Sequence, residues 1–247
     1  MNAPAIPFSP QPILTTDLPV KAVGLSLVID DRAILRDIDL EIGRGEFVAV
    51  LGANGAGKST LLKVIATLTK ATQGELRLFG RTITRESADL RARIGLIAHQ
   101  SMLYRELTAR ENLRFFARLY GIAKVNDRVE LLLDVIGLEN RGNDPIKSFS
   151  RGMVQRVAIA RALLHDPELI LADEPFDGLD APSVAATQEL LAHLHQSGKT
   201  IVLVNHDISQ SLELARRIIV LRSGSIFVDG PADKLNRAIV LAEMGGM

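Results

Sequence analysis

Short apolar runs alternate with helical patterns along most of this chain. Four of these runs have the length of buried strands, and a polar or glycine-bearing turn follows each one. They lie at 47–52, 94–98, 169–173 and 200–205. Two further β-rich runs at 216–230 flank a Ser-Gly pair, which predicts a β-hairpin. Because strands that alternate with helices usually pair in parallel, the pattern predicts a parallel sheet flanked by helices.

Between residues 101 and 168 the strand pattern stops and a helical period replaces it. Thr108 and Glu111 have the spacing of a capping box at the start of a helix. The apolar positions that follow share one helical face, at Leu113, Phe116, Ala117 and Tyr120. A second helix has its apolar face at Val129, Leu132, Leu133 and Ile136. We therefore expect an all-helical subdomain, at about 101–168, inserted in an α/β core.

The first 19 residues contain five prolines and have no basic stretch before an apolar one, so they do not resemble a secretory signal. We expect 1–19 to be a proline-rich, disordered or extended tail, and 20–240 to form the folded domain. No apolar run reaches the roughly 18 residues that a membrane-spanning helix needs. Any association with a membrane is therefore expected to come through another chain.

Charge and cysteine content narrow the classes of function. The 247 residues include 29 Lys and Arg and 29 Asp and Glu, so the chain has no net charge that would attract a nucleic-acid backbone. Nucleic acid is therefore not an expected partner. The absence of cysteine excludes disulfide bonds and thiolate metal sites.

The segment VAVLGANGAGKST has the spacing of a phosphate-binding P-loop between a strand and a helix. Its glycines let the backbone turn tightly, so that several N–H groups point at a bound phosphate. Lys58 is positioned to reach the β- and γ-phosphates, and the Ser59 hydroxyl is a ligand for Mg²⁺. The expected ATP-binding residues are Gly52, Ala53, Asn54, Gly55, Ala56, Gly57, Lys58, Ser59 and Thr60.

A second motif, LILADEP at 169–175, completes this chemistry. An apolar strand delivers Asp173 to the metal ion, and Glu174 beside it is placed to polarise an attacking water. Two acids at a strand end can also be simple caps, but the P-loop upstream favours the catalytic interpretation. The pair predicts hydrolysis of a nucleoside triphosphate.

The stretch SFSRGMVQR, at 148–156, lies far from the P-loop and contains no acid, cysteine or histidine. Ser150 is expected to cap a helix, and Gly152 removes a side chain from its first turn. Capping alone would explain both residues. A helix N-terminus with a serine hydroxyl is also an anion site. Because the P-loop already holds one side of the nucleotide, a second phosphate site this far along the chain makes sense if it faces the nucleotide of another copy.

Together these motifs resemble those of ATP-binding cassette (ABC) transporter ATPases. GANGAGKST, Gln100, FSRGMVQR, LILADEP, GLD at 178–180 and VNHD at 204–207 occur in the order and spacing of that family, over about residues 20–230. The resemblance implies a P-loop α/β core with a small antiparallel β subdomain near the N-terminus and an inserted helical subdomain. It also implies Mg²⁺ as cofactor, integral membrane permease subunits as partners, and a second ATPase subunit bound head to tail, most simply a second copy of this chain.

The resemblance assigns roles to residues outside the P-loop. The family's signature motif corresponds to FSRGM in this chain. In the dimer, this motif of each chain would close on the nucleotide of the other chain, with Ser150 and Gly152 at its γ-phosphate. Gln100 would sense Mg²⁺ and the water, Asp180 would couple the two sites, and His206 would hold Glu174, the water and the γ-phosphate together. The implied signature residues are Ser150, Arg151, Gly152 and Met153; the Mg²⁺ ligands are Ser59, Gln100 and Asp173; the catalytic residues are Lys58, Glu174 and His206.

Three positions depart from the common pattern of the family. The signature reads Phe-Ser-Arg-Gly-Met instead of Leu-Ser-Gly-Gly-Gln, which adds a positive charge at Arg151. Ile29 occupies the register of an aromatic residue that stacks on adenine, so it is expected to contact the base by apolar packing and to select it weakly. His99 precedes Gln100, where proline is more common.

His193 and His195 lie two residues apart on a predicted helix and therefore point to different faces. We expect both on a solvated surface, with no metal or haem site there.

Within the family, three features resemble the ATP-binding subunits that export haem for cytochrome c maturation. They are the His-Gln pair at 99–100, the helix start LTARENL and the signature FSRGM. This resemblance implies a peripheral subunit on the cytoplasmic face of the inner membrane, with separate membrane subunits and no haem bound by the chain itself. Each feature also occurs in exporter ATPases for drugs, polysaccharides or sodium. A cassette ATPase that acts on nucleic acid is a further alternative, disfavoured by the neutral charge.

Overall fold

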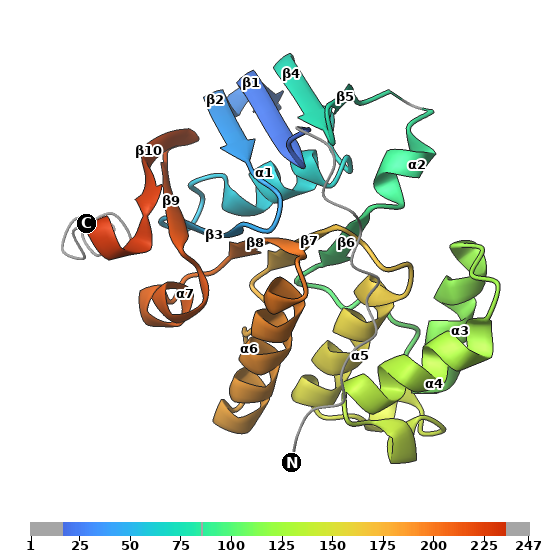
Figure 1. Ribbon diagram of the computed structural model, residues 1–247. Coiled ribbons are helices and arrows are strands. Elements are labelled where there is room, and N and C mark those ends of the chain that lie inside the picture. Colours follow the sequence, from blue (N-terminus) through green and yellow to red (C-terminus); the bar gives the residue numbers. More distant parts are fainter. Residues whose placement is uncertain (1–16, 85, 236–247) are drawn as a thin grey trace.

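The computed structural model describes residues 17–84 and 86–235, which form an α/β structure with two sheets (Figure 1). Most of the predicted tail, residues 1–16, and the end of the predicted domain, residues 236–240, lie outside the described residues. Within the described residues, no helix has both the length and the apolar character needed to cross a membrane.

The larger sheet has six strands in the order β10-β9-β3-β8-β7-β6, and every neighbouring pair is parallel except β9 and β10. Its strands are β3 Phe47–Leu51, β6 Ile94–Ile97, β7 Leu169–Asp173, β8 Thr200–Val204, β9 Arg217–Arg222 and β10 Ser225–Pro231. Every residue of β3, β7 and β8 is buried, because central parallel strands are covered on both faces. The predicted parallel strands and the C-terminal hairpin are confirmed.

The smaller sheet is antiparallel, with the strand order β2-β1-β4-β5. Its strands are β1 Val20–Ile29, β2 Arg32–Ile42, β4 Gln73–Leu78 and β5 Arg81–Thr82. Asp30 and Asp31 form the tight turn between β1 and β2, and both have positive φ, at 46° and 59°. Two such residues are what a type I′ hairpin turn requires. The antiparallel subdomain implied by the family resemblance is confirmed.

Alternate residues of the larger sheet face two different layers. Val48 and Val50 pack in one apolar cluster with α1 and the smaller sheet, whereas Ala49 and Leu51 pack in a second cluster with α5, α6 and the helical segment. Figure 1 shows the larger sheet between these layers. The helices around it are α1 Lys58–Ile65, α2 Ala88–Arg91, α5 Arg151–Leu163, α6 Ala181–Gln196 and α7 Ile208–Leu214.

The segment from 101 to 168 is helical, as predicted. It contains α3 Ala109–Leu119, α4 Val125–Val135, α5 and the short 3-10 turns η1 Glu139–Arg141 and η2 Ile146–Ser148; a third such turn, η3 Ala232–Lys234, follows β10. The capping box of Thr108 and Glu111 is present at the start of α3. Leu113 and Ala117 are fully buried, but Tyr120 is 43% exposed. The prediction was wrong for Tyr120 because α3 ends there, and its ring instead stacks on His165, with centroids 4.0 Å apart.

Glu168 connects three strands at the amino edge of the larger sheet. It precedes β7, and its carboxylate forms ion pairs with Arg93 before β6, at 2.5 Å, and with Arg44 before β3, at 2.6 Å. The Glu168 side chain is only 16% exposed. Burial raises the pKa of its carboxyl, but the hydrogen bonds from Arg93 and Arg44 outweigh burial and leave the pKa below its ordinary value.

Replacing Glu168→Gln is expected to lower the free energy of unfolding by about 2 kcal/mol at neutral pH, because hydrogen bonds to charged partners are lost. Since the folded pKa is lowered, this contribution is complete above the unfolded glutamate pKa of about 4.3 and is lost as the pH falls through the folded value. Urea unfolding at neutral pH and in acid measures both effects.

A matched control is Glu106→Gln, which removes an exposed ion pair with Lys147 and should not change stability measurably. A difference between wild type and Glu168→Gln that stayed constant in acid would contradict the role given to the charge of Glu168.

Candidate functional site

The loop between β3 and α1 is shaped by glycines that no other residue can replace. Gly52 has φ 144°, and a Cβ on it would overlap the carbonyl oxygen of Leu221. Gly57 caps α1 with φ 102°, and a Cβ there would lie 2.9 Å from the carbonyl oxygen of Ile34. Both φ values lie where side chains are rarely tolerated. The loop therefore packs directly against the backbone of β9 at Leu221 and of β2 at Ile34. Its backbone N–H groups lie just before the start of α1.

Lys58 and Ser59 begin α1 and face the carboxyl ends of the strands. Lys58 is 6% exposed, and its Nζ donates to the carbonyl oxygens of Gly52 at 2.8 Å and Ala53 at 2.9 Å. Burial lowers the pKa of Lys58, while the charges of Glu174 and Asp173 oppose this shift. The Ser59 Oγ donates to Asp173 Oδ1 at 2.9 Å, so two residues far apart in sequence meet here.

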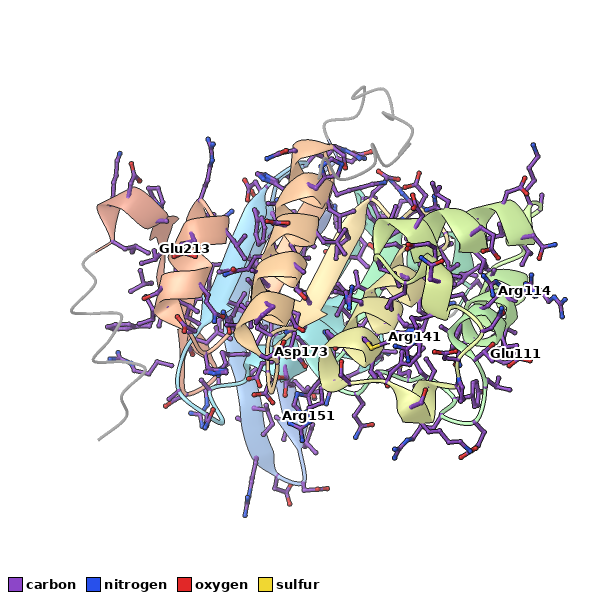
Figure 2. The ribbon with its side chains drawn as sticks, turned by 90° about the horizontal axis from the view of Figure 1, so that it is seen from below. Glu111, Arg114, Arg141, Arg151, Asp173 and Glu213 are labelled. Carbon is purple, nitrogen blue, oxygen red and sulfur yellow. The ribbon has the colours of Figure 1, made fainter. Side chains whose placement is uncertain are left out.

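Glu174 follows the last residue of β7 in a strained backbone conformation. Its φ is 49°, in the left-handed region that residues other than glycine seldom adopt. Its N–H donates to the carbonyl oxygen of Val204 at 2.9 Å, which ties it to the end of β8. The half-buried Glu174 side chain therefore starts from a fixed point, beside the buried Asp173 that Figure 2 labels at the end of β7.

Gln100 and His206 follow the ends of β6 and β8, so they belong to the same edge of the sheet as Glu174. Both side chains are exposed, and within the described residues neither makes a hydrogen bond to Glu174 or Asp173. Ile29 is the last residue of β1 and is 45% exposed. Gln100 and His206 are therefore accessible to a ligand at this edge, the usual ligand-binding edge of an α/β sheet, whereas Ile29 belongs to the smaller sheet.

The signature residues cap the start of α5. Ser150 is the N-cap and accepts a hydrogen bond from the Met153 N–H at 3.3 Å, as predicted from sequence. Met153 packs partly buried against the helical side of the core. Within the described residues, no hydrogen bond connects 150–153 to the loop at 52–60. Arg151, labelled at the start of α5 in Figure 2, is exposed and lies over Gly178, with its Nη1 2.5 Å from where a Cβ would be.

Gly152 is buried against α6 of its own chain. A Cβ on Gly152 would overlap the Ser183 Oγ and lie 2.7 Å from the Ser183 Cβ. Asp180 caps α6 by accepting from the Ser183 N–H at 3.1 Å. Hydrogen bonding from the Ser183 side chain, together with this backbone bond, lowers the pKa of Asp180. The space left by the missing side chain of Gly152 is therefore already occupied inside the chain, by Ser183.

Comparison with known proteins agrees with this geometry. The family model described as ABC transporter matches residues 35–177. The chain belongs to the ABC transporter family. It is 39% identical over 204 residues to the ABC transporter ATP-binding protein NatA of Bacillus subtilis (strain 168), covering 81% of this chain and 83% of the relative. It is 36% identical to the Nod factor export ATP-binding protein I of Cupriavidus pinatubonensis, covering 93% of this chain and 71% of the relative.

The ABC cassette fold is also shared by solved structures. One is a dimeric ATP-binding cassette in a post-hydrolysis state bound to ADP and Pi; it has a TM-score of 0.79 and 31% sequence identity, and the match covers 86% of this chain and 98% of that one. As a member of this family, the chain is an ATP hydrolase whose reaction is coupled to transport across a membrane.

One buried residue of this cassette was missed by the motif analysis. Asn205 is 1% exposed, and its Oδ1 accepts from the N–H groups of His206 at 2.9 Å and Asp207 at 3.3 Å. Its amide donates to the carbonyl oxygen of Asp207 at 3.2 Å. Asn205 thus shapes the turn that presents His206, and its place in VNHD was the available signal.

The prediction of a solvated surface for the histidines of α6 was wrong for His195. Both are half-buried. His195 Nε2 donates to the carbonyl oxygen of Gly45 at 2.9 Å, and its ring meets Phe47 edge-on. The reason is the spacing of 191, 194 and 195, which places His195 on the face of α6 that packs against the sheet.

Gly152→Ala is expected to lower the free energy of unfolding of the cassette by about 1–3 kcal/mol, because the new methyl group overpacks the α5–α6 contact. In a Ser183→Gly background the same substitution should cost less, giving a coupling energy that urea unfolding can measure. Gly230→Ala is the matched control, since a Cβ there meets nothing within 4 Å. Equal costs in both backgrounds would show that Ser183 is not what excludes the methyl group.

Proposed function

We propose that the chain is the ATP-hydrolysing subunit of an exporter and that two chains assemble head to tail, each completing the other's nucleotide site. The observation that supports this most directly is the division of the site. The P-loop, Ser59, Asp173 and Glu174 gather at one sheet edge, whereas the signature at the start of α5 has no hydrogen bond to them within the described residues. For the P-loop and a signature motif to hold the same γ-phosphate, we propose that the P-loop comes from one chain and the signature motif from the other.

The donor atoms at the sheet edge suit Mg²⁺. Ser59 Oγ and Asp173 Oδ1 are 2.9 Å apart, and Mg²⁺ prefers such oxygen ligands together with water and phosphate oxygens. Ser59 and Asp173 would hold the ion, with Gln100 entering from the loop after β6. When bound, Mg²⁺ neutralises phosphate charge during the transfer. Lys58 would exchange its carbonyl partners at Gly52 and Ala53 for phosphate oxygens.

The remaining residues take the roles that their places in the fold allow. Glu174, fixed at the end of β7, would polarise the attacking water, and His206, presented by the Asn205 turn, would hold Glu174 and the γ-phosphate in register. Ile29 would pack against the base. Ser150 and Gly152 would supply the dipole and N–H groups of the α5 N-terminus to the other chain's γ-phosphate, flanked by Arg151 and Met153, and Asp180 would couple the two sites.

An exposed aromatic surface on the helical segment fits a membrane permease subunit. Tyr104, Phe115 and Leu119 are 51%, 38% and 68% exposed, and the rings of Tyr104 and Phe115 meet edge-on with centroids 5.2 Å apart. This surface follows Gln100 in the chain, so a partner bound there would be linked to the metal. We propose that it attaches the subunit to integral membrane subunits at the cytoplasmic face of the inner membrane.

The two-chain site predicts complementation between inactive variants. Ser150→Arg should bind ATP but not hydrolyse it, and Lys58→Ala should be inactive because its P-loop is damaged. A mixed dimer contains one site with both lesions and one with neither, so mixing the purified variants should restore part of the ATPase rate.

Ser148→Arg adds the same charge two residues before the cap and should remain active. A mixture of Ser150→Arg and Lys58→Ala that stays inactive would show that each chain hydrolyses ATP alone.

For the exported molecule, we propose haem destined for c-type cytochromes. The support lies in the His99-Gln100 pair, the LTARENL start of α3 and the FSRGM signature. The chain itself would not bind haem, since it has no cysteine and the two histidines of α6 face different surroundings. One relative is named for export of Nod factor, which makes other cargo the alternative to test.

A host carrying only Lys58→Ala is expected to lose covalently attached haem from its membrane proteins, which haem staining of gels measures. A plasmid copy of the wild-type chain should restore the stain. Normal c-type cytochromes in the presence of the stable but inactive variant would contradict haem export and leave the exporter assignment in place.

A further inference from the structure

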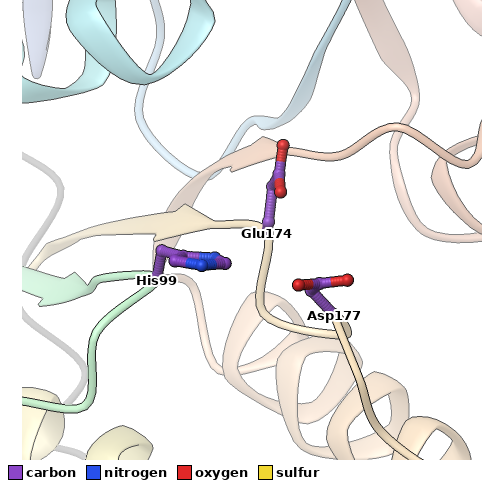
Figure 3. Close-up of side chains that lie close together, drawn as sticks. All are labelled: His99, Glu174 and Asp177. Carbon is purple, nitrogen blue, oxygen red and sulfur yellow. The ribbon is translucent and has the colours of Figure 1, made fainter. Parts of the chain in front are cut away.

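Three side chains with metal-binding atoms converge beside the nucleotide site (Figure 3). They are His99, Glu174 and Asp177, and one ligand atom of each lies within 4.8 Å of the others. The sheet explains why they meet. β6 and β7 pair in parallel with Ile97 opposite Ala172, so His99 and Glu174 both stand two positions beyond a paired residue. Asp177 returns toward Glu174 because its N–H donates to the Glu174 carbonyl oxygen at 3.2 Å.

Protein partners do not satisfy these three groups. Within the described residues, none of the three side chains forms a hydrogen bond or an ion pair. The charge of Lys58 acts on Glu174, but Lys58 Nζ is directed at the carbonyl oxygens of Gly52 and Ala53. The neighbouring carboxylates of Glu174 and Asp177 repel each other, and a cation between them relieves that repulsion.

The imidazole determines which cation fits. Mg²⁺ takes oxygen ligands almost exclusively, whereas a nitrogen with two carboxylate oxygens suits Zn²⁺ and similar divalent transition metals. Zn²⁺ holds its nitrogen and oxygen ligands at about 2.0–2.2 Å, which places tetrahedral ligands about 3.4 Å apart. His99 and Asp177 are exposed, so side-chain rotation can close the remaining distance while the backbone of Glu174 stays anchored. A water would complete the tetrahedron.

We propose that His99, Glu174 and Asp177 form a Zn²⁺ site, made of other residues than the proposed Mg²⁺ ligands Ser59, Gln100 and Asp173, and that Zn²⁺ bound there inhibits ATP hydrolysis. The inhibitory part rests on the proposed role of Glu174. A carboxylate that donates its lone pair to Zn²⁺ no longer polarises the attacking water. Lys58 and Ser59 are not part of the site, so ATP binding persists.

Calorimetric titration of the nucleotide-free full chain with Zn²⁺ tests the site without any need for hydrolysis. We expect binding of one equivalent, with the affinity lowered at least about tenfold by His99→Gln and by Asp177→Asn, as expected for loss of a ligand. His193→Gln is the matched control and should bind like wild type, because His193 lies on α6 outside the cluster. Absence of one-equivalent binding, or binding that His99→Gln leaves unchanged, would overturn the site.

The ATPase rate in Mg²⁺ and ATP, measured with rising Zn²⁺, tests the inhibition. Wild type and His193→Gln should lose activity at Zn²⁺ concentrations that His99→Gln tolerates; equal sensitivity of all three would overturn the inhibitory role. The two proposals fail separately. A chain that binds Zn²⁺ through His99 but never hydrolyses ATP would contradict the proposed function alone. A chain that hydrolyses ATP but binds no Zn²⁺ through His99 would contradict the metal site alone.

Discussion

Parallel pairing of β3, β8, β7 and β6 is the constraint on which the functional site depends. In a parallel sheet every strand ends at the same edge, so the loops that follow these strands must gather there. This is why Ser59 and Asp173, 114 residues apart, share a hydrogen bond. The opposite edge is held by Glu168, whose ion pairs to Arg44 and Arg93 tie the starts of β3, β6 and β7 together. The site thus lies at the carboxyl edge of the sheet, and the ion pairs of Glu168 stabilise the amino edge.

The carboxyl edge of the sheet contains a buried charge and a strained backbone, both of which destabilise the fold. Lys58 is nearly buried, which lowers its pKa, and it is stabilised by two loop carbonyls and by the charges of Glu174 and Asp173. Glu174 has a left-handed backbone held by a hydrogen bond from its N–H to Val204. Backbone strain and buried charged groups of this kind are typical of functional sites, where they hold side chains ready for a ligand. The apolar clusters on both faces of the sheet supply the stability that offsets them.

The signature motif at the start of α5 has to satisfy packing within its own chain and, in the proposed dimer, a contact with the other chain. Gly152 must lack a side chain because Ser183 of α6 already occupies the space beside it. Hydrogen bonds from the side chain and backbone of the same Ser183 lower the pKa of Asp180, which caps α6. In the proposed dimer, the same helix start also meets the γ-phosphate of the other chain. If the dimer forms as proposed, a substitution at Gly152 or Asp180 changes both the stability of one chain and the activity of the pair, and unfolding measurements separate the two effects.

The sequence by itself determined the α/β class, the strands of the larger sheet, the hairpin, the helical segment and the cap at Ser150, because burial on both sheet faces and helix capping leave local patterns. The P-loop and LILADEP motifs also singled out Ser59 and Asp173, which the fold brings within hydrogen-bond distance; their role as Mg²⁺ ligands stays a prediction. Only the tertiary structure decided that His195 packs on Phe47, that Ser183 fills the space at Gly152, and that His99, Glu174 and Asp177 converge. Each of these depends on which strands are neighbours and on where two helices touch. Contacts between residues far apart in the chain leave no periodic pattern of apolar and polar residues, so no short stretch of sequence predicts them.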